Sequence, residues 1–139
     1  MASARDIMTP NPTCVRASDT VHEAAKLMAE LGVGALPICG EDNKLKGMIT
    51  DRDIVVKVLA VDHDPRAVHT GELAQGEAVT IGADDDAEEI LETMTNYQVR
   101  RLPVIDGHDL VGIVSQADVA RAISDPKVGS LVEALSVDY

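Results

Sequence analysis

The stretch LPICGEDNKLKGMITDRD, residues 36–53, recurs later in the chain as LPVIDGHDLVGIVSQAD, residues 102–118. Both copies hold a proline between apolar residues, a polar turn, a glycine within an apolar run, and a Thr or Ser three residues before an aspartate. The shift is 66 residues from Pro37 to Pro103 and 65 residues from Asp53 to Asp118, so the second turn is one residue shorter. The repeat predicts two similar structural units related by pseudo-two-fold symmetry.

The apolar pattern predicts the same order of elements, β-α-β-β-α, in each half of the chain. Asp19 is the expected N-cap of the first helix and Gly32 its end, while the acidic run Asp84 to Asp86 marks the start of the matching helix. Further helices are expected from Thr50 and across residues 119–123. The expected strands are residues 13–15, 35–39, 45–49, 78–81, 102–105 and 110–114. The fold class is therefore α/β, of the mixed α+β kind.

These elements divide the chain into a first repeat over residues 1–60, a connector over 61–71, a second repeat over 72–124 and a C-terminal tail over 125–139. A repeat of this size is marginally stable alone, because a short chain buries too little of its surface. We therefore expect the repeats to pack on each other. His63 and His69 of the connector have no acidic or metal partner at a telling spacing, which favours a solvated loop.

Composition restricts the classes of partner. The formal net charge is −12, and the lysines and arginines form no cluster, whereas binding to a phosphate backbone requires clustered cations. Nucleic acid and an anionic membrane surface are therefore excluded as partners of the whole chain. No apolar run approaches the roughly 18 residues that span a bilayer, and the first residues contain no hydrophobic signal region. We expect a soluble cytoplasmic protein.

The two cysteines, Cys14 and Cys39, do not have the pattern of a secreted disulfide framework or of a zinc knuckle. The interpretation we favour is two buried, small apolar residues with free thiols. The alternative is a disulfide, since both residues lie in expected strands of the first repeat that would be neighbours. Closing that loop would stabilise the chain by about 3 kcal/mol in the chain-entropy model.

The repeated motif, with its glycine and its [ST]-x-x-D ending, resembles the CBS domain, the repeat named after cystathionine β-synthase. The segments Asp6-Ile7-Met8 and Gly71-Glu72-Leu73 before the two copies are also typical. The resemblance covers the whole chain and is closest to small stand-alone bacterial CBS pairs. The pair Cys14 and Cys39 strengthens that closer likeness. It implies a Bateman module, in which two CBS units pack through their sheets and leave two clefts. Such clefts bind AMP, ADP, ATP or S-adenosylmethionine in many members, and the modules often form dimers.

The two aspartates that end the repeated motif are chemically suited to bind a ribose. One carboxylate can accept hydrogen bonds from both ribose hydroxyls, which makes Asp53 and Asp118 candidates, with Thr50 and Ser115 as hydroxyl donors to phosphate or ribose. The same four residues also have the spacing of capping boxes, which is the competing interpretation. The adjacent strands would offer backbone groups and apolar side chains to an adenine, from Pro37, Ile38, Pro103 and Val104.

The two copies differ in charge at one place. Arg100 and Arg101 precede the second copy, where the first copy has Gly34 and Ala35. Adjacent residues of a strand point to opposite faces, so one arginine would face the site and meet a phosphate. The alternative is ion pairing with surface acids. Two weaker candidates, Lys57 and Arg121, lie one helical turn beyond the aspartates.

The sequence contains no metal-ligand cluster, no phosphate-binding glycine loop and no nucleophile with an adjacent base. We therefore expect a non-enzymatic regulatory module without an obligatory cofactor, which binds an adenine nucleotide, forms a homodimer and reports energy or stress state. The alternative is a ligand-free, stress- or hypoxia-associated interaction protein that acts as a dimer on an unidentified protein partner and responds to redox state through Cys14 and Cys39. An enzyme is the third and least favoured class.

Overall fold

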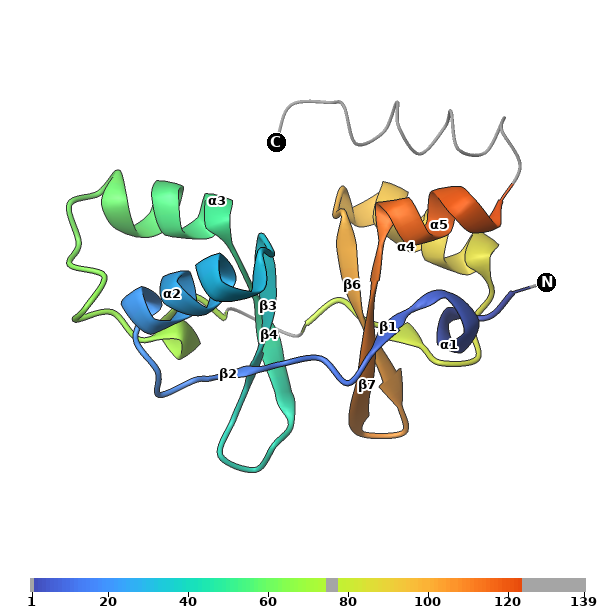
Figure 1. The fold of residues 1–139 in the computed structure, drawn as a ribbon, viewed down its shortest axis with the longest axis horizontal. Helices are drawn as coiled ribbons and strands as arrows, with labels where there is room; N and C mark the ends of the chain where they lie inside the picture. The colour runs from blue at the N-terminus through green and yellow to red at the C-terminus, as the bar shows by residue number, and fades with distance from the viewer. Residues whose placement is uncertain (1, 75–77, 124–139) are drawn as a thin grey trace. The chain divides into compact units, whose positions relative to one another are not determined.

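A computed structural model of the chain describes residues 2–74 and 78–123 (Figure 1). These residues form two compact units, and each unit is built around one copy of the repeated motif. The repeat-1 unit comprises the described residues between Thr13 and Ala78, and the repeat-2 unit comprises residues 2–12 and 79–123. The N-terminal segment, which precedes the first copy in the sequence, thus lies in the unit of the second copy. The expected C-terminal tail, residues 125–139, lies outside the described residues.

The repeat-1 unit contains a three-stranded sheet in the order β2 (Val15–Arg16), β3 (Ala35–Cys39) and β4 (Leu45–Thr50). Strand β2 is parallel to β3, and β3 is antiparallel to β4. Helix α2 (Val21–Leu31) and helix α3 (Asp51–Ile54), which continues as a π-helix over Val55–Leu59, pack on this sheet. A 3₁₀ turn spans Thr70–Glu72. The buried core consists of aliphatic residues, namely Val15, Val21, Ala24, Met28, Leu36, Ile38, Ile49, Ile54 and Val58.

The repeat-2 unit contains a four-stranded sheet in the order β1 (Thr9–Pro10), β7 (Asp109–Ser115), β6 (Arg101–Asp106) and β5 (Ile81–Gly82). Its helices are α1 (Ala4–Ile7), α4 (Ala87–Tyr97) and α5 (Gln116–Ala122). The core is again aliphatic, with Ile81, Ile90, Met94, Leu102, Val104, Val114 and Val119. The mixed α/β class and the repeated β-α-β-β-α order are therefore confirmed.

The first strand of each repeat is shorter than expected, since β2 begins at Val15 and β5 at Ile81. The cap of α2 was also predicted wrongly. Thr20, and not Asp19, is the N-cap, because its hydroxyl accepts a hydrogen bond from the Glu23 amide at 3.1 Å. Asp19 closes the preceding turn instead, by accepting from the Arg16 amide at 2.9 Å.

The acidic residues Asp84 to Asp86 show the same separation between helix capping and turn closure. Asp86 is the N-cap of α4, and Asp85 accepts from the Gly82 amide at 2.7 Å. Capping, as expected of this run, therefore involves Asp86, whereas Asp85 closes the preceding turn as Asp19 does. These negative charges also affect the first turn of α4, where the Asp85 carboxylate raises the pKa of Glu89.

The segments that precede the two copies dock in matching ways. Helix α1 joins the repeat-2 unit through the amide of Ala4, which donates to the Asp85 carbonyl at 2.7 Å. In the repeat-1 unit the amide of Thr70 donates to the Asp19 carbonyl at 2.8 Å. The leading segments are thus exchanged between the units. Each one precedes one copy of the motif in the sequence but packs into the unit that contains the other copy.

This exchange explains the repeated glycine of the motif. A Cβ atom on Gly112 would lie 2.8 Å from Met8 Cγ and 3.0 Å from the Thr9 carbonyl oxygen. On the matching Gly47 it would lie 3.0 Å from the Ala74 Cβ. The glycine therefore lets the exchanged segment approach the sheet closely.

Candidate functional site

The four motif residues form two complete capping boxes. In the repeat-1 unit Asp53 donates its amide to Thr50 Oγ1 at 3.0 Å, and Asp53 Oδ2 accepts from the Thr50 amide at 3.0 Å. In the repeat-2 unit the matching distances for Asp118 and Ser115 are 3.2 and 2.8 Å. The capping interpretation therefore holds in both copies. The boxes fix the carboxylates at the start of α3 and α5.

The second oxygen of each carboxylate forms an ion pair with the cationic side chain one helical turn further along. Asp53 Oδ1 lies 3.3 Å from Lys57 Nζ, and Asp118 Oδ1 lies 2.6 Å from Arg121 Nη2. The Asp118 side chain is only 11% exposed, against 24% for Asp53. Each carboxylate oxygen has two lone pairs, so both aspartates retain acceptor capacity beyond these contacts. A ribose role for them stays a prediction.

The two arginines of the second copy lie beside the Ser115 capping box. Arg101 is directly opposite Ser115 in the antiparallel register of β6 and β7, and Arg100 accepts at its carbonyl from the Gln116 amide at 2.8 Å. Residues directly opposite each other in a sheet point to the same face, so Arg101 is the arginine on the face of Ser115. Both arginines are exposed.

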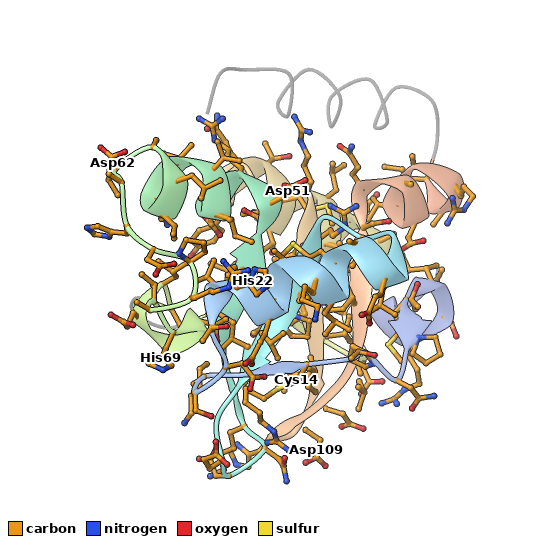
Figure 2. The ribbon with its side chains drawn as sticks, turned by 60° about the vertical axis from the view of Figure 1, so that its left-hand side comes forward. Cys14, His22, Asp51, Asp62, His69 and Asp109 are labelled. Carbon is orange, nitrogen blue, oxygen red and sulfur yellow. A yellow bond between two sulfur atoms is a disulfide. The ribbon has the colours of Figure 1, made fainter. Side chains whose placement is uncertain are left out.

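The matching place in the repeat-1 unit has no such cation. Ala35 is opposite Thr50, and the Gly34 carbonyl accepts from the Asp51 amide at 2.9 Å. Asp51, at the start of α3 (Figure 2), directs its carboxylate toward Gly34, with Oδ2 3.0 Å from where a Cβ atom of that glycine would lie. The two copies therefore present an arginine in one unit and a carboxylate in the other.

The strand residues that we expected to contact an adenine also take part in the core and the hairpins. Ile38 and Val104 are fully buried in the cores of their units. Pro37 is paired with Met48 and Pro103 with Ile113 in the registers of the two hairpins. The side chains of Ile38 and Val104 are therefore committed to folding, and a nucleotide role for these four residues stays a prediction.

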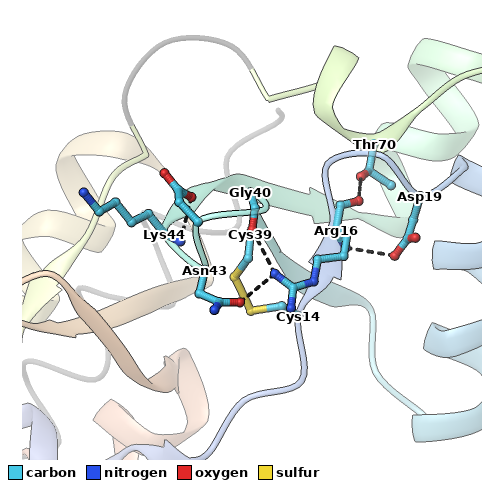
Figure 3. Close-up of a disulfide and its surroundings, with 9 residues drawn as sticks. Cys14, Arg16, Asp19, Cys39, Gly40, Asn43, Lys44 and Thr70 are labelled. Atoms are coloured by element: carbon cyan, nitrogen blue, oxygen red, sulfur yellow. Dashed lines mark hydrogen bonds between the residues drawn. A yellow bond between two sulfur atoms is a disulfide. The ribbon is translucent and has the colours of Figure 1, made fainter.

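Cys14 and Cys39 are joined by a disulfide, with their Cα atoms 5.9 Å apart (Figure 3). The structure thus has the bridge and not the two free thiols that we favoured. The bond ties the segment before β2 to the last residue of β3, across a parallel strand pair. Cys39 is 3% exposed, whereas Cys14 is only partly buried.

Arg16 organises the surroundings of the disulfide, and sequence reasoning missed it. Its Nη1 donates to the Gly40 carbonyl at 2.9 Å and to Asn43 Oδ1 at 2.6 Å, which fastens the turn after β3 (Figure 3). Its carbonyl accepts from the hydroxyl of Thr70 at 2.7 Å, and Thr70 is fully buried. The signal available in the sequence was the asymmetry with the second copy, where Gly82 stands at the matching position.

The connector histidine His69 has an acidic partner, contrary to our expectation. Its Nδ1 lies 3.4 Å from Glu72 Oε2, and its amide donates to the same oxygen at 2.6 Å. These hydrogen bonds lower the pKa of Glu72. The His69 side chain is exposed at the surface of the repeat-1 unit (Figure 2). Across the described residues, no three His, Cys, Asp or Glu side chains gather to hold a metal ion, and no helix is long and apolar enough to cross a membrane.

The paired motifs, capping boxes and repeated sheet topology agree with a match to known families. A model described as the CBS domain matches residues 4–60 and again residues 71–125. The chain belongs to the CBS domain family. It is 47% identical over 135 residues to hypoxic response protein 1 of Mycobacterium tuberculosis, and the match covers 97% of this chain and 94% of that protein. This confirms the resemblance to stand-alone CBS pairs, since such coverage leaves that relative no room for a separate catalytic domain.

Solved structures agree with this assignment. The crystal structure of Hypoxic Response Protein I with two coordinated zinc ions is 49% identical, with a TM-score of 0.82, and covers 88% of this chain and all of that one. CBSX2 in complex with AMP is 26% identical, with a TM-score of 0.75 and coverage of 88% and 96%. The CBS pair of protein MJ0100 with 5′-methylthioadenosine and S-adenosyl-L-methionine is 28% identical, with a TM-score of 0.78 and coverage of 88% and 95%.

Proposed function

We propose that this chain is a non-enzymatic regulatory CBS pair that binds an adenine nucleotide through the repeat-2 unit and reports energy or stress state. The observation that carries the proposal is Arg101, which lies directly opposite Ser115 on the face of the capping box. That arrangement supplies a cation for phosphate and, in Asp118, a fixed carboxylate for the ribose hydroxyls. Relatives with solved structures bind AMP or S-adenosyl-L-methionine. The proposal includes a homodimer and a cytoplasmic location.

The capping residues allow a sharp test of the ribose role. An Asn at this position keeps a side-chain oxygen that can accept from the Ser115 amide, so the Asp118→Asn variant is expected to fold normally while losing affinity for AMP. The same substitution at Asp53 is the matched variant in the other unit. Isothermal titration calorimetry with AMP, ADP, ATP and S-adenosylmethionine measures both. Unchanged affinity in the Asp53→Asn/Asp118→Asn double variant would refute the ribose role.

The phosphate role of Arg101 is tested by comparing AMP with adenosine. The Arg101→Gln variant should weaken AMP binding and leave adenosine binding unchanged, because only AMP carries the charge that the guanidinium meets. Arg66→Gln, on the exposed connector, is the control. A ligand at 100 times its dissociation constant stabilises the protein by about 2.7 kcal/mol. If the thermal midpoint shifts with none of these ligands, the nucleotide proposal fails.

A second candidate function is favoured by the disulfide. In this reading the chain is a ligand-free, stress- or hypoxia-associated dimer whose state depends on the Cys14–Cys39 bond. Disulfides seldom persist in a reducing cytoplasm, so at the proposed location this bond would form and break with redox state. Comparing the oligomeric state and protein partners of oxidised and reduced protein tests this function. Identical behaviour of the two forms would refute it.

A further inference from the structure

The two cysteines of the disulfide are unequally exposed. Cys39 ends strand β3 and is 3% exposed, so its side chain is almost fully enclosed. Cys14 precedes β2, lies outside any strand and is partly exposed. A thiolate must approach a disulfide in line with the S–S bond and from the side of the sulfur that it attacks. The greater exposure of Cys14 therefore favours attack of a thiolate at Cys14 over attack at Cys39.

The charge near the bond favours its opening. The Arg16 guanidinium donates to the carbonyl of Gly40, the residue directly after Cys39, and this places a positive charge near the bridge. A nearby arginine stabilises a thiolate, and a thiol with a lower pKa is expelled faster from a disulfide. The Arg16 charge thus stabilises the thiolate that leaves when the bridge opens. The matching residues of the second copy, Thr80, Gly82 and Ile105, offer neither a disulfide nor a cation.

We propose that Cys14 Sγ is the site at which a low-molecular-weight thiol opens the bridge and becomes covalently attached. The thiolate sulfur bonds to Cys14 Sγ, the bond between the two cysteine sulfurs breaks, and its electron pair leaves on Cys39 Sγ. A second thiol then releases the reagent as its own disulfide and frees Cys14, so two thiols supply the two electrons. This inference rests on the redox function of the preceding section and names its reactive atom and reagent class.

Attachment at Cys14 has a defined structural consequence. Cys14 lies two residues after Pro12, where the chain passes from the repeat-2 unit into the repeat-1 unit. Opening the bond removes the covalent link between this crossing segment and β3, whereas the hydrogen bonds of Arg16 to the turn and to the hydroxyl of Thr70 do not involve the sulfur atoms. The modified group is therefore placed on the connection between the units, and the sheet of the repeat-1 unit keeps its pairing.

Peptide mapping tests the proposal directly. Oxidised full-length protein is treated briefly with glutathione, the free thiols are trapped with iodoacetamide, and both cysteine peptides are analysed by mass spectrometry. We expect glutathione on Cys14 and the carbamidomethyl group on Cys39. Glutathione on Cys39, an equal distribution over both residues, or no adduct would each overturn the proposal. Opening at Cys14 with unchanged oligomeric state and partners would refute the redox function while supporting the assignment of the reactive sulfur.

The role of Arg16 is tested by the rate of opening. Arg16→Met should slow glutathione attachment roughly threefold to tenfold, since the departing thiolate loses its cation. Arg16→Lys should recover most of the rate, because it keeps the charge but changes the geometry of the donors. Arg66→Met, elsewhere in the same unit, is the matched control and should react like the wild type. Equal rates in Arg16→Met and Arg66→Met, or no recovery in Arg16→Lys, would show that the cation does not direct the opening.

Discussion

The repeat-1 and repeat-2 units share one framework of strands and helices, and they differ in their cross-links and in the placement of charged side chains. Both have a parallel strand pair, a hairpin with the close-approach glycine, and a capping box at the last helix. The repeat-1 unit adds the Cys14–Cys39 disulfide and Arg16, whereas the repeat-2 unit adds Arg101 opposite its capping box. The shared residues all have roles in folding. The residues that distinguish the copies are therefore the better guide to function.

The largest expected difference between the units comes from the disulfide. The Cys14→Ser/Cys39→Ser variant should lose about 3 kcal/mol of unfolding free energy, because the unfolded chain is no longer closed into a loop. Chemical denaturation measures this, and reduced wild-type protein is the control that should fall to a similar stability. Titration of air-oxidised, denatured protein should find no free thiol. Two free thiols per chain would contradict the bridge.

The close-approach glycines should respond unequally to the same substitution. Gly112→Ala should cost about 1–3 kcal/mol, because its Cβ would crowd Met8 and the Thr9 carbonyl, which belongs to the paired strand β1. Gly47→Ala should cost less, since its nearest neighbour is the side-chain methyl of Ala74. Chemical denaturation of the two variants measures the difference. A larger loss in Gly47→Ala would show that the exchanged segments are not held as the structure describes.

The two capping hydroxyls should be nearly equivalent. Thr50→Ala and Ser115→Ala should each destabilise the protein by about 1 kcal/mol, because each leaves one helix amide without its acceptor. If Ser115 also binds ligand, its variant alone should lose AMP affinity while both lose stability. Equal loss of affinity in both variants would remove the distinction that Arg101 makes between the copies.

The sequence predicted the elements and their order because the repeated apolar pattern reports which residues face a core. Strands β3 and β4 and the helix ends at Gly32 and Thr50 follow from local residue types. Docking of the leading segments could not be predicted in this way, since their hydrogen bonds are to residues about 50 to 80 positions away. The role of Arg16 was hidden for the same reason. Its partners lie in a turn and a connector that no periodic pattern links to it.

The smallest expected effect compares the carboxylates that close the two leading segments. The Ser3 amide and hydroxyl lower the pKa of Asp6, and the His69 amide lowers that of Glu72. A carboxylate whose pKa is lower in the folded state stabilises the fold above its ordinary pKa and loses that contribution as pH falls through the lowered value. Asp6→Asn and Glu72→Gln should thus be slightly less stable than the wild type at neutral pH and approach its stability as the pH falls through the lowered pKa values. Thermal midpoints measured across this range check the prediction. A difference that stays constant with pH would mean that the charge of these carboxylates contributes nothing to docking.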